Sequence, residues 1–176
     1  MSVLIFVTVG SRNYPFDRLF CRIDELCEKG ILTEEIFAQT GTSAYHPRHY
    51  HSRKFLTAEE FDQAIKAADI VVSHGASGSI MSALKYHKKV IAVTRLAKYK
   101  EHINDHQIQT NEAFARNGYV LMADLELNNL EDCFRIIYEK KDHLKPWKNQ
   151  DPLAIVRRID QFIQENWEAG TWTSTG

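Results

Sequence analysis

Short apolar runs alternate along this chain with longer segments that are apolar on one face only. The first run is VLIFVTV at residues 3–9, which is rich in β-branched residues and ends at Gly10 and Ser11. Such continuous runs are typical of strands buried on both faces of a parallel sheet. Similar patterns predict further strands at residues 34–40 (EEIFAQT), 53–56 (RKFL), 69–74 (DIVVSH), 89–94 (KVIAVT) and 119–122 (YVLM).

The segments between these runs have the apolar spacing of helices. From residue 15 to residue 29, apolar side chains recur three and four positions apart, and Gly30 ends the segment. Thr57 and Glu60 have the spacing of a capping box before the next helix. Helices are therefore predicted over residues 15–29, 58–68, 77–87, 104–117, 128–141 and 152–167. The last has an apolar stripe, expected to pack on the domain, with docking to a partner as the alternative; its members are Leu153, Val156, Ile159, Ile163 and Trp167.

The alternation of strands and helices predicts the fold class. Strands that alternate with helices of this length form βαβ units, whose right-handed crossovers place helices on both faces of a parallel sheet. We therefore predict an α/β domain with a single Rossmann-like, doubly wound parallel sheet. The 176 residues are enough for one domain with a substantial core. The domain is expected to span residues 1–168, with a frayed tail at 169–176.

Composition and charge narrow the function classes. The net charge is −1 and no long basic run is present, which argues against a nucleic-acid partner. Three cysteines, an odd number without a CxxC pair, favour reduced thiols in the cytoplasm over a disulfide framework. No stretch reaches the roughly 20 apolar residues of a membrane span. The N-terminal SVLIFVTVG is interpreted as a buried strand, because it is short and lacks a basic region before it.

Two predicted loops have the residue types that receive an anion. In open α/β sheets, ligands bind where the carboxyl ends of strands lead into helices. One loop begins with Gly10 and Ser11, and the other is His74-Gly75-Ala76-Ser77-Gly78-Ser79. Small residues let backbone N–H groups approach a phosphate, and the following helix adds a favourable dipole. The alternative is a tight strand-to-helix turn without a ligand. A Walker A lysine and a GxGxxG spacing are both absent.

A second polar cluster lies in KEHINDHQ, where Glu101, His102, Asp105, His106 and Gln107 gather before a predicted helix. A carboxylate beside an amide offers acceptors and donors side by side, which suits vicinal hydroxyls. The alternative is a solvated helix start with Asp105 facing the helix dipole. A metal site at these histidines, or in the loop containing His46, His49 and His51, is not favoured because no third ligand is evident.

Taken in order, several stretches resemble the donor-binding half of a two-lobed (GT-B) glycosyltransferase. They are IFVTVGSRNYPFDRL, QTGTS, AADIVVSHGASGSIMSAL, KKVIAVTRL, EHINDHQ and NEAFARNGY, and the resemblance covers residues 3–122. The order of these stretches is similar to the order of motifs in the glycosyltransferase family 28 C-terminal domain, as it occurs in stand-alone subunits. Such subunits occur in bacterial exopolysaccharide and capsule synthesis and in the dolichol-linked N-acetylglucosaminyltransferase, and the C-terminal lobe of MurG is a more distant relative.

This resemblance implies a role for each part of the site. The loop from His74 to Ser79 would hold the diphosphate of a UDP-sugar, and the stretch from Asp105 to Gln107 would meet the sugar hydroxyls. Phe55 and Leu56 would lie against the uracil, and Gly10 and Ser11 would border the acceptor side. Many relatives have a ribose-binding glutamate where this chain has Ser82. Either Glu101 or Ser82 takes its place, or donor binding is weaker or differently specified.

The resemblance also implies a reaction and partners. The expected chemistry is transfer of a hexose with inversion, without a metal cofactor, to a lipid-linked saccharide acceptor. The base is expected to be His102 or His106, or to lie on another chain. Since this chain has room for one Rossmann-like half only, a membrane-anchored subunit would supply the acceptor lobe and keep the protein at the cytoplasmic face of the membrane. The alternatives are a non-catalytic module that stabilises or activates a partner transferase, and an unrelated α/β protein that binds a nucleotide or phosphate.

Overall fold

The computed structural model describes residues 3–147 together with residues 157 and 161. Strands and helices alternate through this part of the chain, as the hydrophobic pattern predicts. The strands are β1 (Leu4–Thr8), β2 (Glu35–Gln39), β3 (His51–Arg53), β4 (Ile70–Ser73), β5 (Lys89–Ala92) and β6 (Leu121–Met122). The helices are α1 (Asp17–Glu28), α2 (Ala58–Ala67), α3 (Ser77–Lys85), α4 (His106–Arg116) and α5 (Leu130–Tyr138), with a 3-10 turn η1 (Ala97–Tyr99) after β5.

The six strands form one parallel sheet in the order β3-β2-β1-β4-β5-β6. β1 lies between β2 and β4, so the chain first builds the sheet outward on one side and then returns to build the other side. The crossover places a reversal of strand order between β1 and β4. In open α/β sheets, the loops at such a reversal diverge and leave a crevice beyond the carboxyl ends of the strands.

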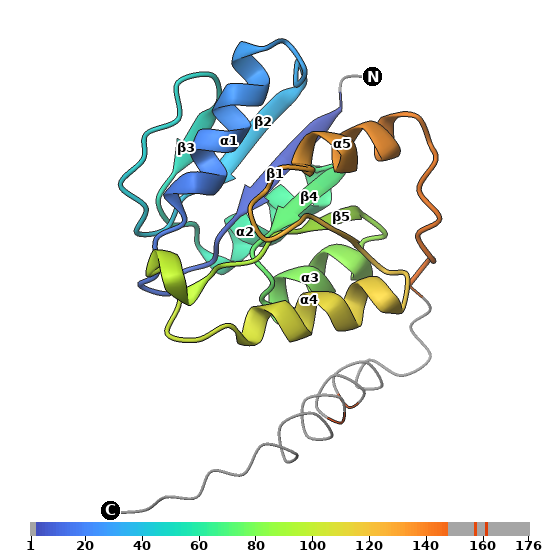
Figure 1. The fold of residues 1–176 in the computed structure, drawn as a ribbon. Coiled ribbons are helices and arrows are strands. Elements are labelled where there is room, and N and C mark those ends of the chain that lie inside the picture. The colour runs from blue at the N-terminus through green and yellow to red at the C-terminus, as the bar shows by residue number, and fades with distance from the viewer. Residues whose placement is uncertain (1–2, 148–156, 158–160, 162–176) are drawn as a thin grey trace, which may run out of the picture.

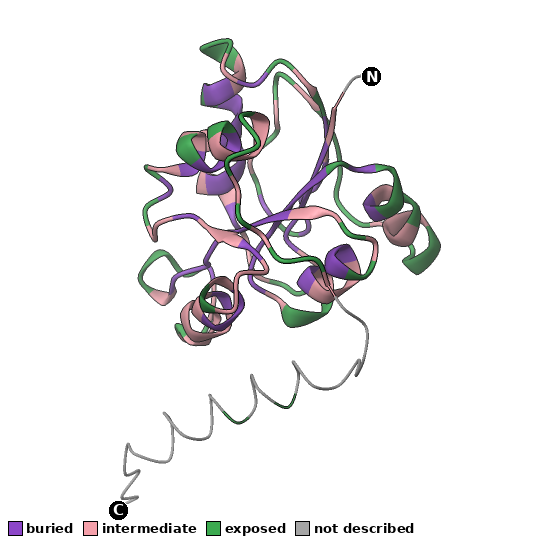
Figure 2. Cartoon of the chain, turned by 90° about the vertical axis from the view of Figure 1, so that its right-hand side faces the viewer, coloured by how far each residue is buried: buried purple, intermediate pink, exposed green. Residues whose placement is uncertain are grey.

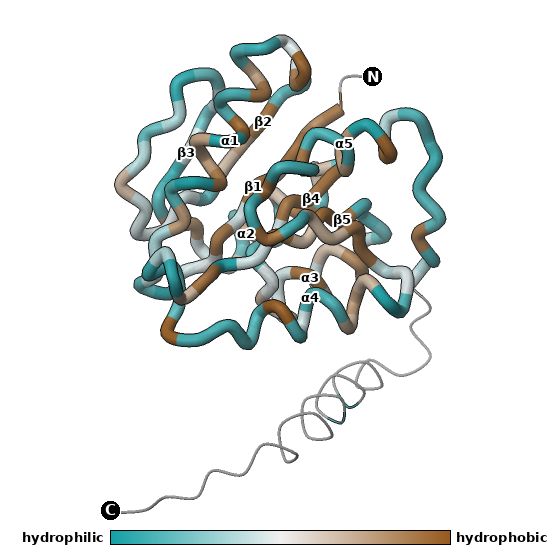
Figure 3. Tube along the Cα trace, viewed as in Figure 1, coloured by the Kyte–Doolittle hydropathy of each residue, from teal (hydrophilic) through white to brown (hydrophobic). Residues whose placement is uncertain are grey.

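Helices cover both faces of this sheet, so the prediction of a doubly wound α/β fold is confirmed (Figure 1). Ile5, Val7 and Val9 point to one face, where they pack in a core with α1 and α5. Phe6 points to the other face and packs in a second core with α2, α3 and α4. Hydrophobic residues are concentrated along the central strands (Figure 3), and buried residues line the strands and the inner sides of the helices (Figure 2).

The prediction for the third strand is wrong. β3 occupies 51–53 rather than 53–56, and all three of its residues are exposed. It pairs with β2 through the registers Phe37↔His51, Ala38↔Ser52 and Gln39↔Arg53. Backbone hydrogen bonds to β2 therefore hold this edge strand, and its side chains carry no apolar signal.

Several other predictions lie partly or wholly beyond the described part of the chain. The predicted helix at 152–167, its apolar stripe, the domain limit at 168 and the tail at 169–176 fall outside the described residues, except for positions 157 and 161. Within the described residues, no helix has both the length and the apolar character needed to cross a lipid bilayer.

Candidate functional site

A cavity of about 640 Å³ lies beyond the carboxyl ends of β1, β4 and β5. The cavity is open to solvent and lies where the strand order reverses between β1 and β4, which is the place where the geometry of the sheet predicts a crevice. The loops after these strands and the first turns of α3 and α4 form most of its wall. Its lining residues are Gly10, Ser11, Arg12, Phe61, His74, Gly75, Ala76, Ser77, Gly78, Ser79, Ser82, Arg95, His102, His106, Gln107 and Thr110.

The loop after β4 is shaped by a glycine in the left-handed region. Gly75 has φ +82°, and a Cβ there would lie 2.8 Å from both polar side-chain atoms of Asn111. Asn111 is fully buried and fixed by hydrogen bonds from its Nδ2 to the Val93 carbonyl (3.0 Å) and the Thr94 hydroxyl (2.9 Å). Only glycine fits this close approach without displacing Asn111.

The first turn of α3 faces the cavity without a side-chain cap. Ala76 occupies the N-cap position, where no side chain accepts a hydrogen bond from the first turn, and that turn has no acidic residue. The N–H groups at the start of a helix have no partner within the helix and carry the positive end of its dipole. Ser77, Gly78 and Ser79 therefore combine backbone donors and two hydroxyl groups at the cavity wall.

His74 is a buried, neutral side chain that lines the cavity. Burial, assisted by the nearby positive charge of Arg95, lowers the pKa of His74 to about 3. Its Nδ1 lies 3.2 Å from the Thr8 carbonyl oxygen, which only accepts hydrogen bonds, so Nδ1 carries the proton. Nε2 is consequently an acceptor. Gly10, with φ +71°, lets the backbone pass so close to this ring that a Cβ would lie 2.9 Å from its Cε1.

Two arginines line the cavity, and no carboxylate is among its described lining residues. Arg12 is exposed, whereas Arg95 is only 1% exposed. Arg95 Nη2 donates to the carbonyls of Val9 (2.8 Å) and Tyr14 (2.6 Å), which ties the loop after β1 to the end of β5. Burial lowers the pKa of Arg95 to about 10, so the guanidinium remains charged at neutral pH. The cavity is therefore electropositive.

Most of the site residues predicted from the sequence come together around this cavity. Gly10, Ser11, the loop from His74 to Ser79, Ser82, His102, His106 and Gln107 all line it. The His102 ring packs on Tyr14 with a centroid distance of 4.8 Å. Gln107 accepts a hydrogen bond through Oε1 from the Arg95 backbone N–H at 3.4 Å. Their roles toward a ligand remain predictions.

The structure places four of the predicted residues away from the cavity. Glu101 is 4% exposed and pairs with Arg18 Nε (2.7 Å) and Nη2 (3.0 Å), and it accepts a hydrogen bond from the Leu96 N–H (2.9 Å). This pairing ties Glu101, in the loop after β5, to α1, so Glu101 is not placed to replace a ribose-binding glutamate. Asp105 accepts a hydrogen bond from the Ala97 N–H and likewise does not line the cavity.

Phe55, which is 47% exposed, also does not line the cavity. Leu56 is the fourth of these residues. It lies in a separate groove between the β2–β3 edge and α2, and it packs against the core cluster that contains Phe6. Phe61 of α2 is the aromatic side chain that lines the main cavity instead. A single apolar position in an amphipathic helix gives no signal that separates it from ordinary core residues.

Arg12, Arg95 and Thr110 are further lining residues that the sequence analysis missed. Arg95 had a usable signal, because it follows directly after the buried run KVIAVT, at the edge where ligands bind.

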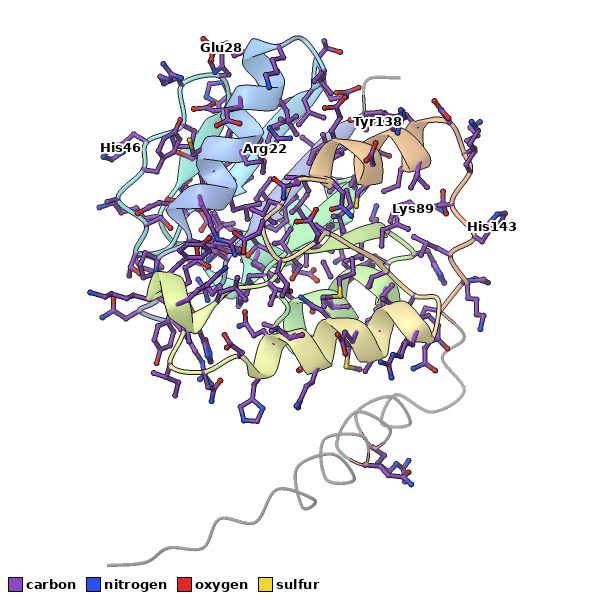
Figure 4. All side chains as sticks on the ribbon, viewed as in Figure 1. Arg22, Glu28, His46, Lys89, Tyr138 and His143 are labelled. Carbon is purple, nitrogen blue, oxygen red and sulfur yellow. The ribbon has the colours of Figure 1, made fainter. Side chains whose placement is uncertain are left out.

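The histidines outside the cavity have other surroundings. Asp24 is buried and holds the loop of His46, His49 and Tyr45 by accepting hydrogen bonds from the His49 N–H and the Tyr45 hydroxyl. Burial alone would raise the pKa of Asp24. Hydrogen bonds from the Arg48 and His49 N–H groups and from Tyr45 outweigh this effect and lower the pKa. His46 points outward from this loop (Figure 4). Among the described residues, no three His, Cys, Asp or Glu side chains are grouped as metal ligands would be.

The fold and the cavity define a class: a Rossmann-like α/β protein with a positively charged crevice at the carboxyl edge of its sheet. The sequence comparison then identifies the family. Residues 4–161 match the glycosyltransferase family 28 C-terminal domain, and the chain belongs to this family.

Individual relatives agree with this assignment. The chain is 27% identical over 103 residues to the UDP-N-acetylglucosamine transferase subunit ALG13 of Cryptococcus neoformans, covering 58% of this chain and 46% of that protein. The chain thus spans about half the length of the curated relatives it matches. An NMR structure of ALG13 is similar with a TM-score of 0.63 at 19% identity, covering 90% of this chain and 95% of that chain. Acinetobacter baumannii MurG is similar with a TM-score of 0.58 at 15% identity, covering 93% of this chain and 50% of that chain. These structures support the fold, which corresponds to the C-terminal half of GT-B glycosyltransferases.

Proposed function

We propose that this chain is the donor-binding subunit of a UDP-sugar-dependent hexosyltransferase. The observation that carries the proposal is the cavity itself: its wall joins the uncapped N-terminus of α3 to two arginines, with no lining carboxylate among the described residues. Such a wall suits a diphosphate, because backbone N–H groups, hydroxyls and cations all favour negative charge. Membership in the glycosyltransferase family makes a nucleotide sugar the natural source of that diphosphate.

In the proposed complex, the diphosphate lies against Ser77, Gly78 and Ser79. These groups are held in place before the reaction and stabilise the charge that develops on the UDP leaving group as the bond to the sugar breaks. This role requires no metal cofactor, since fixed donors and cations supply the positive potential. Gln107 and Thr110 line the cavity beyond this loop and are assigned to the sugar hydroxyls.

The chemistry of His74 favours contact with a hydroxyl. With its proton on Nδ1, the ring offers a lone pair at Nε2, which accepts from a hydroxyl and does not donate to a phosphate oxygen. His102 and His106 also line the cavity and are the proposed candidates for the base that removes the proton of the attacking acceptor hydroxyl. Attack opposite the leaving UDP would transfer the hexose with inversion.

The acceptor lobe is proposed to come from a second, membrane-anchored subunit. The described part of the chain forms one Rossmann-like half, whereas two-lobed enzymes place the acceptor on another half. The ALG13 relative is named as a subunit of a UDP-N-acetylglucosamine transferase, which supports an assembly of this kind. The proposed acceptor is a lipid-linked saccharide of exopolysaccharide or capsule synthesis, and the protein would work at the cytoplasmic face of the membrane through its partner.

Calorimetric titration of the full chain with UDP tests donor binding. We expect binding of UDP that Ser79→Ala weakens by about tenfold, because this variant removes a hydrogen bond to the diphosphate; Gln107→Ala should weaken the binding of a UDP-sugar by about tenfold, because it removes a hydrogen bond to the sugar. Ser52→Ala and Gln63→Ala are matched controls outside the cavity and should leave the affinity unchanged. Absence of UDP binding, both alone and with the partner subunit, would overturn the proposal.

Turnover with the partner subunit separates an enzyme from a non-catalytic module. The replacement of the expected ribose-binding glutamate by Ser82 motivates this second candidate. We expect Ser79→Ala to lower the rate of sugar transfer in the reconstituted pair. A full rate with this variant would instead identify the chain as a stabilising module.

A further inference from the structure

Arg95 is a buried cation whose charge no carboxylate of the described chain neutralises directly. Its side chain is 1% exposed although it lines the cavity. Within the described residues, the Arg95 side chain donates hydrogen bonds through Nη2 alone, to two backbone carbonyls. Its Nε is buried and has no hydrogen-bond partner. A buried charge with incomplete pairing is strongly destabilising, so a fold that keeps one needs a compensating partner.

The carboxylate of Glu101, which interacts with Arg95, is already engaged by other donors. Glu101 attracts the Arg95 guanidinium electrostatically. However, its two oxygens receive hydrogen bonds from Arg18 and from the Leu96 N–H. Arg18 and Glu101 thus neutralise each other, and Arg95 remains as the surplus positive charge beside the cavity.

The position of Arg95 is fixed before any ligand arrives. Nη2 is held by the Val9 and Tyr14 carbonyls, and the Arg95 backbone N–H is held by Gln107. The guanidinium carbon also lies 5.9 Å from the centroid of the Phe16 ring. A cation fixed in a poorly solvated wall interacts more strongly with an anion than a mobile surface side chain does. Arg12, by contrast, is exposed.

We infer that Arg95 is the fixed counter-charge for the phosphates of the donor, an inference that rests on the proposed function. The part of the donor that Arg95 recognises is the diphosphate and not the nucleoside. Neutral parts of the donor, the base and the ribose, gain nothing from this charge. Arg95 therefore sets the preference of the site for phosphorylated ligands.

The alternative is that Arg95 only fastens the loop after β1 through the Val9 and Tyr14 carbonyls. The two roles predict different ligand dependence. Loss of a counter-charge lowers the affinity for phosphorylated ligands selectively, whereas a displaced loop lowers the affinity for every ligand of the cavity.

The test is a calorimetric titration of the full chain with UDP, inorganic pyrophosphate and uridine. We expect Arg95→Gln to lower the affinity for UDP and for pyrophosphate by at least about tenfold and to change the affinity for uridine by less than about twofold. Arg116→Gln, which removes a positive charge on α4 outside the cavity, should change none of them. Arg95→Lys keeps a charge in the cavity and should retain more pyrophosphate affinity than Arg95→Gln, or than Arg95→Met if Arg95→Gln does not fold.

The outcomes separate this inference from the proposed function. If Arg95→Gln binds UDP as tightly as the unsubstituted chain, or if its affinities for uridine and UDP fall by the same factor, the inference is overturned while donor binding stands. If the unsubstituted chain binds pyrophosphate in an Arg95-dependent way but not UDP, the proposed donor is wrong, and only the role of Arg95 as a counter-charge for phosphates stands. If it binds neither anion, both are overturned.

Discussion

Replacement of Gly75 by alanine should destabilise the whole domain, because the loop after β4 is packed directly on a buried side chain. The new Cβ would lie 2.8 Å from Nδ2 and Oδ1 of Asn111, a separation that real Cβ atoms essentially never show. Asn111 cannot move at low cost, since its Nδ2 is bonded to Val93 and Thr94 in the core. The backbone itself, at φ +82°, lies in the region that side chains disfavour.

The magnitude follows from two contributions. A non-glycine residue in the left-handed region costs about 1–2 kcal/mol. Displacing Asn111 weakens two buried hydrogen bonds, each worth about 1 kcal/mol. Gly75→Ala should therefore lower the free energy of unfolding by about 3–4 kcal/mol, which in a domain of this size corresponds to a fall in Tm of about 10 °C.

Gly78→Ala is the matched control for this prediction. Gly78 lies in α3 three residues further on, and a Cβ there would meet no atom within 4 Å. Alanine in a helix is favoured over glycine by up to about 1 kcal/mol, so this variant should be as stable as the unsubstituted chain or slightly more stable. Urea unfolding followed by circular dichroism measures both variants. If Gly75→Ala unfolds within about 0.5 kcal/mol of Gly78→Ala, the close packing of this loop on Asn111 is refuted.

Three further substitutions test other parts of the site. Glu101→Gln should lower the free energy of unfolding by about 3 kcal/mol, because it leaves Arg18 without its carboxylate; an unchanged urea midpoint contradicts this. His74 binds its proton at a pKa of about 3 in the fold but near 6.5 when unfolded, so stability should fall as the pH falls from 6.5 toward 3. His74→Gln should remove up to about 3 kcal/mol of the difference between unfolding at pH 7 and pH 4, and an equally steep acid loss in that variant rules the effect out. Ser82→Glu should raise the preference for UDP over 2′-deoxy-UDP several-fold, by about 1 kcal/mol; an unchanged ratio means that the ribose does not lie beside residue 82.

Much of the fold could be predicted from the sequence because the central strands are buried on both faces. β1, β4 and β5 are continuous apolar runs, and their pattern depends only on local residues. β3 could not be placed in the same way, since its three exposed residues are held by backbone pairing to β2. The loop from His74 to Ser79 was recognisable because its composition and its position after a strand both point to a ligand.

The parts of the site that were misplaced depend on contacts between distant residues. Glu101 looked available for a ligand, but Arg18, which lies 83 positions earlier, takes both of its oxygens. Leu56 directly follows Phe55 at an exposed edge, yet it turns into the core cluster beside α2. Neither pairing has a local signature, because charge neutralisation and side-chain packing are decided by the tertiary fold.

The two buried carboxylates and the one buried arginine of the described chain differ in a way that points to the role of the cavity. Asp24 accepts hydrogen bonds from the loop around His49, and Glu101 pairs with Arg18, so each carboxylate is satisfied within the protein. Arg95 meets carbonyl oxygens only, and its Nε has no partner. Since Glu101 and Arg95 belong to the same loop region after β5, the neutral pair fixes that region while the unbalanced cation remains at the cavity wall. A domain that satisfies its buried carboxylates internally and keeps a buried positive charge in the wall of a cavity that the start of α3 also lines has the electrostatics that the proposed diphosphate site requires.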